Sequence, residues 1–397
     1  MDLKKLYSII SALLILVNMS CVEELPLVTE NFEDTIVIEA TITDELKTQQ
    51  IKLSRTIRLE ENTPNFEANA QVRVETNNGT TYEFAYQGEG IYTSNQEFQA
   101  VDDESYTLFV QTSNGNSYVS NEEVLVSNSE IDSIYAELVN NGEQNGITVF
   151  VDSKENSSNP RFFRYEYEET YKIVAPIFSL EDLFFDNIMG SGESLTYTTR
   201  LEPRPIEQQT CYTTTKSNEI IITSINGLDE NSVSRFPVRF ITEQDPIIRV
   251  RYSILVKQFT QSANANNFYK VLKELSSDES LLIDIQPGFV QGNIFSQQST
   301  QEKVLGFFDV SSVDSERIYF NHEDFNIDLP PYFFDCDVIN FDELSTNSTQ
   351  RIRLLRLVND VGFKYIEESD EGLFIVNPPC GDCTIFSSSE IPSFWED

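Results

Sequence analysis

The sequence predicts a mainly β protein, with an N-terminal antiparallel β-sandwich followed by a larger β-rich domain that contains one or two helices. From Thr35 onward, apolar residues alternate with other residues in short runs, which is the period of a half-buried strand. Turn signals separate these runs, and a helical period stands out at residues 263–276. The 397-residue chain is 40% hydrophobic and 12% aromatic, so it can form a packed core despite a net charge of -38.

The first 20 residues have the composition of a lipoprotein signal peptide. Lys4 and Lys5 form a positive start, and Leu6–Val17 is an apolar run of secretory length. This run is too short to span a bilayer, and no later apolar stretch reaches the roughly 20 residues that spanning requires. Cys21 follows the small residue Ser20, as in lipoproteins that signal peptidase II cleaves before an acylated cysteine. We expect Cys21 to be acylated; an ordinary signal peptide that contains a cysteine is the alternative.

Residues 21–33 are expected to form an acidic tether without strands. Acyl chains on Cys21 would hold the protein permanently on the membrane, because each buried methylene contributes about 0.8 kcal/mol. Only this anchor is expected to touch the bilayer. Fully extended, the roughly dozen residues after the cysteine reach up to about 40 Å.

Residues 34–129 are predicted to form the N-terminal sandwich. Its first strand alternates, with apolar side chains at Ile36, Ile38, Ala40 and Ile42. Further strand-like runs lie at 51–57, 72–76, 82–85 and 106–112. Turn signals lie at 77–79 and 113–116, and a kink at 88–90. About seven short strands in this length are typical of immunoglobulin-like or transthyretin-like sandwiches.

Residues 130–397 are predicted to form the larger β-rich domain. A long strand pattern covers 247–259. Phe268, Val271, Leu272 and Leu275 then have helical spacing after Ser262, a candidate N-cap, which predicts an amphipathic helix at 263–276 packed on the core. Residues 176–210 predict a short helix or loop. Other strand-like runs lie at 131–138, 146–151, 162–173, 281–285, 304–310, 317–320 and 353–358.

The charge distribution excludes nucleic acid as a partner. The chain has 65 acidic against 27 basic side chains and no basic run, so it repels phosphate backbones. The single histidine, His322, excludes chemistry that needs two imidazoles. His322-Glu323-Asp324 lacks a partner at metal-ligand spacing, so we expect a surface histidine and no metal site. Without a nucleophile elbow, phosphate loop or dinucleotide fingerprint, no cofactor is expected.

Four cysteines follow Cys21 in the chain: Cys211, Cys336, Cys380 and Cys383. An even number in an exported protein predicts two structural disulfides, but four cysteines allow three pairings and the sequence does not choose among them. The alternative is a redox pair of Cys380 and Cys383. Pro378-Pro379 precede that pair and no helix is predicted to begin there, so its surroundings do not favour an activated thiolate.

Short segments spread over the mature chain form a recognisable set. They are Val37–Ala40, Leu53-Ser54, Ala70–Val72, Gly90–Tyr92, Tyr106–Val110, Arg251–Phe259, Phe268-Tyr269, Gln286–Ile294, Val304–Phe308, Arg317–Phe320, Cys380–Cys383 and Pro392–Trp395. Jointly they resemble the domain of unknown function 4249 family of Bacteroidota lipoproteins. The resemblance implies an outer-membrane lipoprotein whose gene often neighbours that of a TonB-dependent transporter.

The acidic pair Glu23-Glu24 is similar to the signal that sends such lipoproteins to the cell surface. Our hypothesis is a non-catalytic surface lipoprotein that binds an unidentified ligand or docks on a TonB-dependent transporter as its accessory. Two alternatives stay open. One is an envelope hydrolase that uses paired carboxylates, and the other is a structural or assembly lipoprotein that faces the periplasm.

Two short motifs predict modification. Asp34-Thr35-Ile36 and Asp132-Ser133-Ile134 resemble the O-glycosylation acceptor of exported Bacteroidota proteins. Thr35 and Ser133 are therefore candidate glycosylation sites at edges of the predicted domains. Trp395, the only tryptophan, is expected to be a packed plug near the C-terminus.

Overall fold

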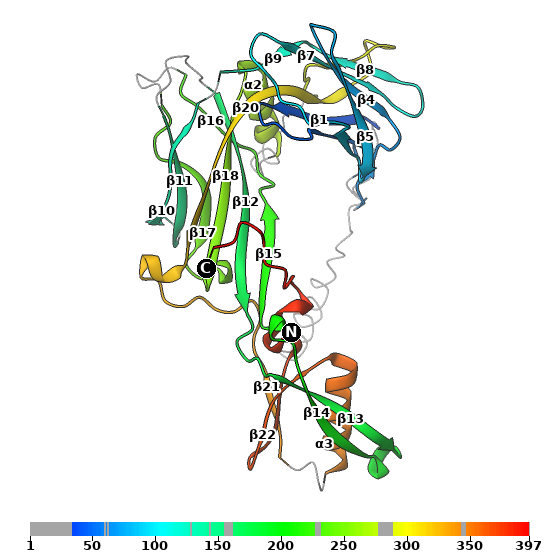
Figure 1. Cartoon of the computed structure of the whole chain (residues 1–397), viewed down its shortest axis with the longest axis vertical. Coiled ribbons are helices and arrows are strands. Elements are labelled where there is room, and N and C mark those ends of the chain that lie inside the picture. Colours follow the sequence, from blue (N-terminus) through cyan, green and yellow to red (C-terminus); the bar gives the residue numbers. More distant parts are fainter. Residues whose placement is uncertain are drawn as a thin grey trace, which may run out of the picture.

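The computed structural model describes residues 34–58, 61, 63–127, 129–142, 144–154, 162–226, 232–276, 289–342 and 347–396. These residues are mainly β, as predicted, and form three parts along one long axis (Figure 1). We call them the N-terminal sandwich (34–127 with 289–311), the central sandwich (129–175, 209–260 and 312–333) and the distal lobe (176–208 and 334–391). The N-terminal sandwich overhangs one side of the central sandwich in this view.

The N-terminal sandwich is a curled, mostly antiparallel sheet around its own core. Its strands are β1 (Ile36–Thr43), β2 (Gln50–Arg55), β3 (Asn65–Phe66), β4 (Gln71–Thr76), β5 (Thr81–Gly88), β6 (Ile91–Ser94), β7 (Ser105–Gln111), β8 (Ser117–Ser120), β9 (Glu123–Val124) and β19 (Ile294–Ser296). The predicted turn at 77–79 joins β4 to β5, and Gly79 there has a φ of 88°, which favours glycine.

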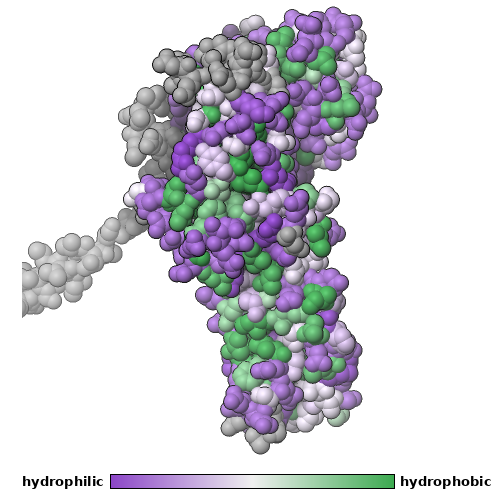
Figure 2. Space-filling view, turned by 60° about the vertical axis from the view of Figure 1, so that its left-hand side comes forward, coloured by the Kyte–Doolittle hydropathy of each residue, from purple (hydrophilic) through white to green (hydrophobic). Residues whose placement is uncertain are grey.

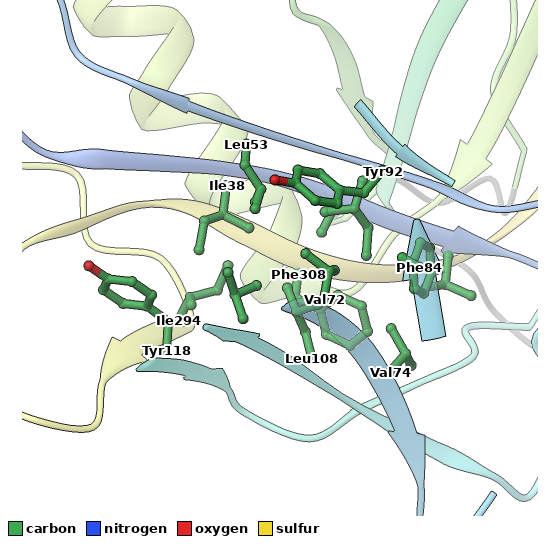
Figure 3. Close-up of a cluster of buried hydrophobic side chains, with 14 of the residues drawn as sticks. Ile38, Leu53, Val72, Val74, Phe84, Tyr92, Leu108, Tyr118, Ile294 and Phe308 are labelled. Atoms are coloured by element: carbon green, nitrogen blue, oxygen red, sulfur yellow. The ribbon is translucent and has the colours of Figure 1, made fainter. Parts of the chain in front are cut away.

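The predicted alternation in β1 is confirmed. Ile36, Ile38, Ala40 and Ile42 are buried, and they meet side chains from the facing strands in one apolar cluster. Figure 3 shows Ile38, Leu53 and Phe308 directed towards Val72 and Leu108 on the opposite side. The buried ring of Tyr92 lies at the edge of this cluster, where its hydroxyl accepts a hydrogen bond from the Ala70 amide and donates one to the Glu67 carbonyl, both at 2.9 Å.

The central sandwich packs a long sheet against a three-stranded sheet. The long sheet contains β12 (Phe162–Val174), β15 (Thr210–Lys216), β16 (Ile221–Ser224), β18 (Arg251–Thr260) and the second half of β20 (Val304–Phe320), and the smaller sheet contains β10 (Ile131–Asn140), β11 (Asn145–Ser153) and β17 (Phe236–Thr242). Between the sheets lie apolar side chains of β11, β12 and β18, among them Val149, Tyr165 and Ile254.

Strand β20 belongs to both sandwiches. Residues 304–311 pair in parallel with β1, and residues 312–320 pair antiparallel with β18. The segment that leads into β20 adds β19 to β8. Residues 289–311, which the sequence analysis assigns to the C-terminal domain, therefore complete the N-terminal sandwich. The two halves differ in burial, since residues 304–312 are almost all buried and most of residues 313–320 are not, but this difference does not reveal which strand each half pairs with.

The predicted helix is confirmed as α2 (Ala263–Ser276). Ser262 is its N-cap residue, since the Ser262 hydroxyl accepts a hydrogen bond from the Ala265 amide at 3.1 Å. The apolar stripe packs as predicted: Phe268 is buried, and its ring lies 5.5 Å from that of Phe307 on β20. Helix α2 therefore covers the outer face of the N-terminal sandwich beside β20. The expected strand at 281–285 lies outside the described residues.

The distal lobe combines an excursion between β12 and β15 with the C-terminal region. It contains β13 (Glu181–Met189), β14 (Thr196–Pro203), β21 (Val338–Phe341), α3 (Ser348–Arg356), β22 (Lys364–Ser369), β23 (Gly372–Val376) and the short α4 (Pro378–Gly381). A small core around Leu183, Leu354 and Ile375 holds it together.

Two secondary-structure predictions in this lobe are wrong. Residues 181–203 form a hairpin rather than a helix or loop, and because most of its side chains are exposed, the strands leave no clean alternation in the sequence. The strand expected at 353–358 is the end of α3 and the helical turn that follows. Leu354, Leu357 and Val358 pack on the core of the lobe at helical spacing.

The C-terminus returns to the central sandwich. The ring of Trp395 lies 4.9 Å from that of Tyr212 and 6.0 Å from that of Tyr319, which agrees with the expected plug. The guanidinium of Arg317 stacks 3.6 Å from the centre of the Phe394 ring. These contacts fasten the chain end to β15 and β20.

Candidate functional site

A two-chambered cleft lies where β20 passes from one sandwich to the other. The alternation of β1 and β20 turns Ile38 and Phe308 into the sandwich core and leaves Glu39 and Phe307 on the outer face. Helix α2 stands against this outer face, and β12 borders it from the central sandwich. The cleft therefore has walls from both sandwiches and from the helix between them. We call it the junction cleft.

The larger chamber has a volume of about 600 Å³ and mostly apolar walls. Its apolar lining includes Val37, Ile220, Phe268, Leu272, Leu305 and Phe307, with the ring of Tyr269. Four charged side chains also reach it: Glu39, Lys52, Arg164 and Glu166. A volume between roughly 300 and 1,000 Å³ with apolar walls and few polar groups is typical of small-molecule sites.

The smaller chamber has a volume of about 330 Å³ and a polar lining. Thr43, Lys47, Thr48, Gln49, Lys257 and Phe259 line it alone. Thr41, Gln50, Arg164 and Glu166 line both chambers. The two chambers therefore meet at the Arg164–Glu166 pair.

Arg164 is the central charged group of the cleft. It is 7% exposed, and its guanidinium bonds to the Glu166 carboxylate and lies 4.2 Å from the centre of the Phe259 ring and 5.0 Å from that of Tyr269. Burial opposes its charge, but the neighbouring Tyr269 and Glu166 outweigh that effect, so the pKa of Arg164 is raised and the side chain stays cationic. Its Nε atom has no hydrogen-bond partner among the described residues.

Asp309 lies fully buried behind Arg164 on the outer face of β20. One carboxylate oxygen accepts hydrogen bonds from Gln261 at 3.0 Å and Ser311 at 2.8 Å, and the other has no partner among the described residues. Burial raises the pKa of Asp309, and the opposing effects of Arg164 and of the two hydrogen bonds do not cancel this shift. A fully buried acid that is easier to protonate than usual thus interacts with the arginine of the cleft wall.

Lys257 is a half-buried cation of the smaller chamber without a fixed anionic partner. Its register partner on β12 is Glu166, which is engaged by Arg164. Within the described residues, Lys257 has no ion pair. Lys47, the other lysine of this chamber, bonds to Glu45. Basic groups therefore gather here in a chain whose net charge is -38.

The two carboxylates of the larger chamber each lie beside a cation. Glu39 is 3.7 Å from the ammonium of Lys52, and Glu166 bonds to Arg164. Carboxylate-based hydrolysis uses an acid and a second carboxylate that face the substrate together. Glu39 and Glu166 are each engaged by a cation instead, so they do not form such a catalytic pair. Apolar walls beside basic groups suit the binding of a small molecule.

A protein-family model matches the part of the chain that builds the cleft. The model of the family described as a domain of unknown function (DUF4249) matches residues 22–317, about three quarters of the chain. The chain belongs to the DUF4249 family. All lining residues of both chambers fall inside the matched range, and the C-terminal part of the distal lobe lies beyond it. No curated protein matches the chain.

Sequence reasoning did not identify the cleft of this DUF4249 protein. Arg164 and Lys257 stand in strands at positions that alternate with buried aromatic or apolar residues, a pattern that also describes any solvated strand face. Asp309 offers a weak signal, since a lone acid between Phe308 and Val310 stands in an otherwise apolar run. The position of α2 over these strands is what encloses them.

The predicted disulfides of the DUF4249 chain are present. Cys211 bonds to Cys383 across 172 residues, and Cys336 bonds to Cys380 across 44 residues. The alternative redox pair of Cys380 and Cys383 is therefore wrong, because each sulfur bonds to a different partner. Cys211–Cys383 holds β15 to the C-terminal region, and Cys336–Cys380 joins two segments within that region.

The Cys-Gly-Asp-Cys motif at 380–383 is a structural clamp. Asp382 lies 3.3 Å from Arg204, whose side chain is almost fully buried, and 3.2 Å from Lys364. Contrary to expectation, a short helix does begin before the first cysteine, since Pro378–Gly381 form α4. Proline is favoured in a first helical turn because it needs no donor there. The motif thus joins two disulfides and a buried ion cluster.

His322 is buried, at 8% exposure, so the expected surface histidine is wrong. The reason is its place at the start of a short 3-10 turn (His322–Phe325), where its Nδ1 atom lies 2.9 Å from the Ile327 carbonyl oxygen. Among the described residues, no group of three acidic, histidine or cysteine side chains is arranged to hold a metal ion.

The structure describes two of the candidate modification sites, Thr35 and Ser133, but not Cys21. Cys21 and the acidic pair after it lie outside the described residues. Thr35 and Ser133 are both half-buried, next to β1 and in β10 respectively, and their glycosylation stays a prediction. Within the part of the chain that the structure describes, no helix is long and apolar enough to cross a membrane.

The distal lobe carries many exposed hydrophobic side chains. Figure 2 shows hydrophobic residues over the lower, narrow part of the body. Exposed members include Leu180, Phe184, Ile188, Met189, Leu201, Val338, Ile352 and Val361. Gatherings of this kind are often sites of protein contact.

Proposed function

We propose that this DUF4249 protein is a non-catalytic outer-membrane lipoprotein that binds a ligand in the junction cleft and serves a TonB-dependent transporter as its accessory. The observation that carries the binding role is the cleft itself. An apolar chamber of about 600 Å³ adjoins a polar chamber that basic side chains line. Both sandwiches and α2 build its walls, so a bound ligand would touch all three elements.

The anchor and the location rest on the N-terminal sequence. The apolar run before Cys21 and the small residue Ser20 support acylation of Cys21. Glu23-Glu24 support display on the cell surface, because the pair is similar to a surface-export signal. In this arrangement the tether of residues 21–33 would hold the folded body outside the bilayer.

The transporter partnership rests on the family resemblance and on the surface of the distal lobe. The family implies gene neighbours that encode TonB-dependent transporters. Exposed hydrophobic side chains such as Phe184 and Met189 supply the kind of surface that a protein partner covers. We place partner docking on this lobe and ligand binding at the junction cleft.

Co-purification from native outer membranes tests the partnership. The tagged lipoprotein is isolated from gently solubilised membranes, and its partners are identified by mass spectrometry. A transporter-sized barrel in equal amount is expected. Repeated recovery of the lipoprotein alone would contradict the accessory role.

Protease treatment of whole cells tests the orientation. A surface lipoprotein should be degraded while a periplasmic control protein stays intact. Survival of the lipoprotein until the outer membrane is permeabilised would support the alternative of a periplasm-facing assembly lipoprotein.

A further inference from the structure

We propose that the junction cleft binds an amphipathic anion, with its hydrocarbon part in the larger chamber and its acidic head in the smaller one. This inference names the ligand class of the site and rests on the binding role proposed above. It follows from three features of the cleft: the division into an apolar and a polar chamber, the lysine of the polar chamber that forms no ion pair among the described residues, and the buried arginine between the chambers.

The larger chamber favours a hydrocarbon group. Phe268 and Leu272 of α2 pack with Leu305 and Phe307 of β20 and line it together. Removal of apolar surface from water is the main favourable term for a ligand in such a chamber, because about 25 cal/mol is gained for each Å² buried. The charged side chains at its border are already paired with one another, Lys52 with Glu39 and Arg164 with Glu166. A ligand group here therefore gains from apolar contact rather than from charge.

The smaller chamber favours an acidic head. Lys257 lines this polar space and forms no ion pair among the described residues, although the charge of Glu45 lies near enough to interact with it. In a chain with 65 acidic and 27 basic side chains, a half-buried lysine that forms no ion pair among the described residues is unexpected on composition alone. Lys47 adds a second ammonium to the same chamber, where it bonds to Glu45. A carboxylate or phosphate would give Lys257 a partner through a charge-assisted hydrogen bond.

Arg164 lies where the two parts of such a ligand would meet. Its side chain is more than nine-tenths buried, lines both chambers and has an Nε atom without a partner among the described residues. The Phe259 and Tyr269 rings hold the guanidinium in place from its faces. A preorganised cation of this kind binds an anion without a large ordering cost.

Isothermal titration calorimetry with ligands of one chain length separates the contribution of the acidic head to the affinity from that of the hydrocarbon tail. The protein is the mature chain with Cys21→Ser, so that no acyl chain of its own competes, and every probe is kept below its micelle concentration. Dodecanoate and dodecyl phosphate carry acidic heads, dodecanol and dodecylamine do not, and acetate has no tail. Binding of either acid, at least about tenfold tighter than that of dodecanol and dodecylamine, is expected, because a charge-assisted bond contributes about that factor. Acetate should not bind measurably.

Three variants test the assignment of the chambers. Lys257→Gln should weaken dodecanoate about tenfold and leave dodecanol unchanged, since only the head loses a contact. Leu272→Glu should abolish binding of both by placing a charge in the apolar chamber. Lys216→Gln, an exposed lysine at the end of β15 and away from the cleft, is the matched control and should bind as the parent does. Circular dichroism and the thermal midpoint show whether each variant is folded; if Leu272→Glu unfolds, Lys257→Gln decides alone.

The outcomes distinguish the ligand class from the accessory role. Equal affinity for dodecanol and dodecanoate, or an unchanged affinity in Lys257→Gln, would overturn the amphipathic-anion assignment. A preference for dodecyl phosphate over dodecanoate would assign the head as a phosphate, and the reverse as a carboxylate. Co-purification of a transporter alongside failure of every acidic probe would leave the accessory role standing and refute the ligand class only.

Discussion

Gly306 and Ile38 are register partners in the parallel pair of β20 and β1, and the Ile38 carbonyl oxygen occupies the space that a Cβ atom at residue 306 would need. Gly306 also has a φ of 135°, a conformation that side chains strongly disfavour. Its own carbonyl oxygen packs in the same way against Gly292. The seam between β1 and β20 thus depends on backbones approaching too closely for any side chain.

Gly306→Ala should therefore destabilise the protein by about 2–4 kcal/mol, through backbone strain and a clash at the seam. Urea unfolding followed by circular dichroism measures the change. Gly79→Ala is the matched control, because Gly79 also has a positive φ but open space around its Cα atom. Equal losses in the two variants would mean that the close approach to Ile38 contributes nothing.

Tyr92→Phe should cost about 1–3 kcal/mol, because the buried Ala70 amide and Glu67 carbonyl each lose their hydrogen bond to the hydroxyl. The same unfolding measurement applies. Tyr86, the register partner of Tyr92, is 39% exposed, so Tyr86→Phe removes a comparable hydroxyl from the surface. That control should change the free energy of unfolding by less than about 0.5 kcal/mol.

The disulfides should contribute unequally to stability. In the chain-entropy model, the 172-residue loop closed by Cys211–Cys383 gives about 5 kcal/mol and the 44-residue loop closed by Cys336–Cys380 about 4 kcal/mol. Replacement of each pair by serine, followed by thermal unfolding, compares them. Non-reducing peptide mapping should recover these two pairings, and a Cys380–Cys383 peptide would contradict the structure.

The raised pKa of Asp309 predicts that the free energy of unfolding depends on pH. Its pKa is raised in the folded protein, so the folded state holds this proton more tightly than the unfolded state does. The stability of the parent protein relative to Asp309→Asn should therefore fall as pH rises above the usual aspartate value of about 3.9, and level off above the folded-state pKa. Each unit of upward shift corresponds to about 1.4 kcal/mol.

Denaturant unfolding of both proteins between acidic and neutral pH measures this difference. Thr41→Ala, at the register partner of Asp309 on β1, provides a control without a titratable group at the altered site. A difference between the parent and Asp309→Asn that stays constant over this range would show that Asp309 titrates alike in both states.

Cys21→Ala should abolish lipid attachment. Metabolic labelling with palmitate is expected to mark the parent protein and leave the variant completely unlabelled, because the thiol is the proposed acceptor. Ser20→Ala keeps a small residue before the cysteine and should still be labelled. Label on Cys21→Ala would place the lipid elsewhere in the chain.

Local hydrophobic patterns were sufficient to predict the strands and helices that bury one face. The period of two in β1 and the period of 3.6 in α2 each record which side chains face a core, and the structure confirms both. They failed where a segment buries little, as in the 181–203 hairpin. They also failed where one segment fits both a strand period and a helical period. Leu354, Leu357 and Val358 have helical spacing within residues 353–358, for which the sequence predicts a strand.

The sequence by itself determined that the chain is mainly β, that one amphipathic helix spans 263–276, and that the four cysteines after Cys21 pair as two disulfides. Only the tertiary structure decided which cysteines bond, that residues 304–311 pair with β1, and that Arg164 and Lys257 line one cleft. The physical reason is the sequence separation between the segments that contact one another. A local period reports that a face is buried, whereas the identity of what covers it depends on segments more than 100 residues away, which compete for the same apolar surface during folding.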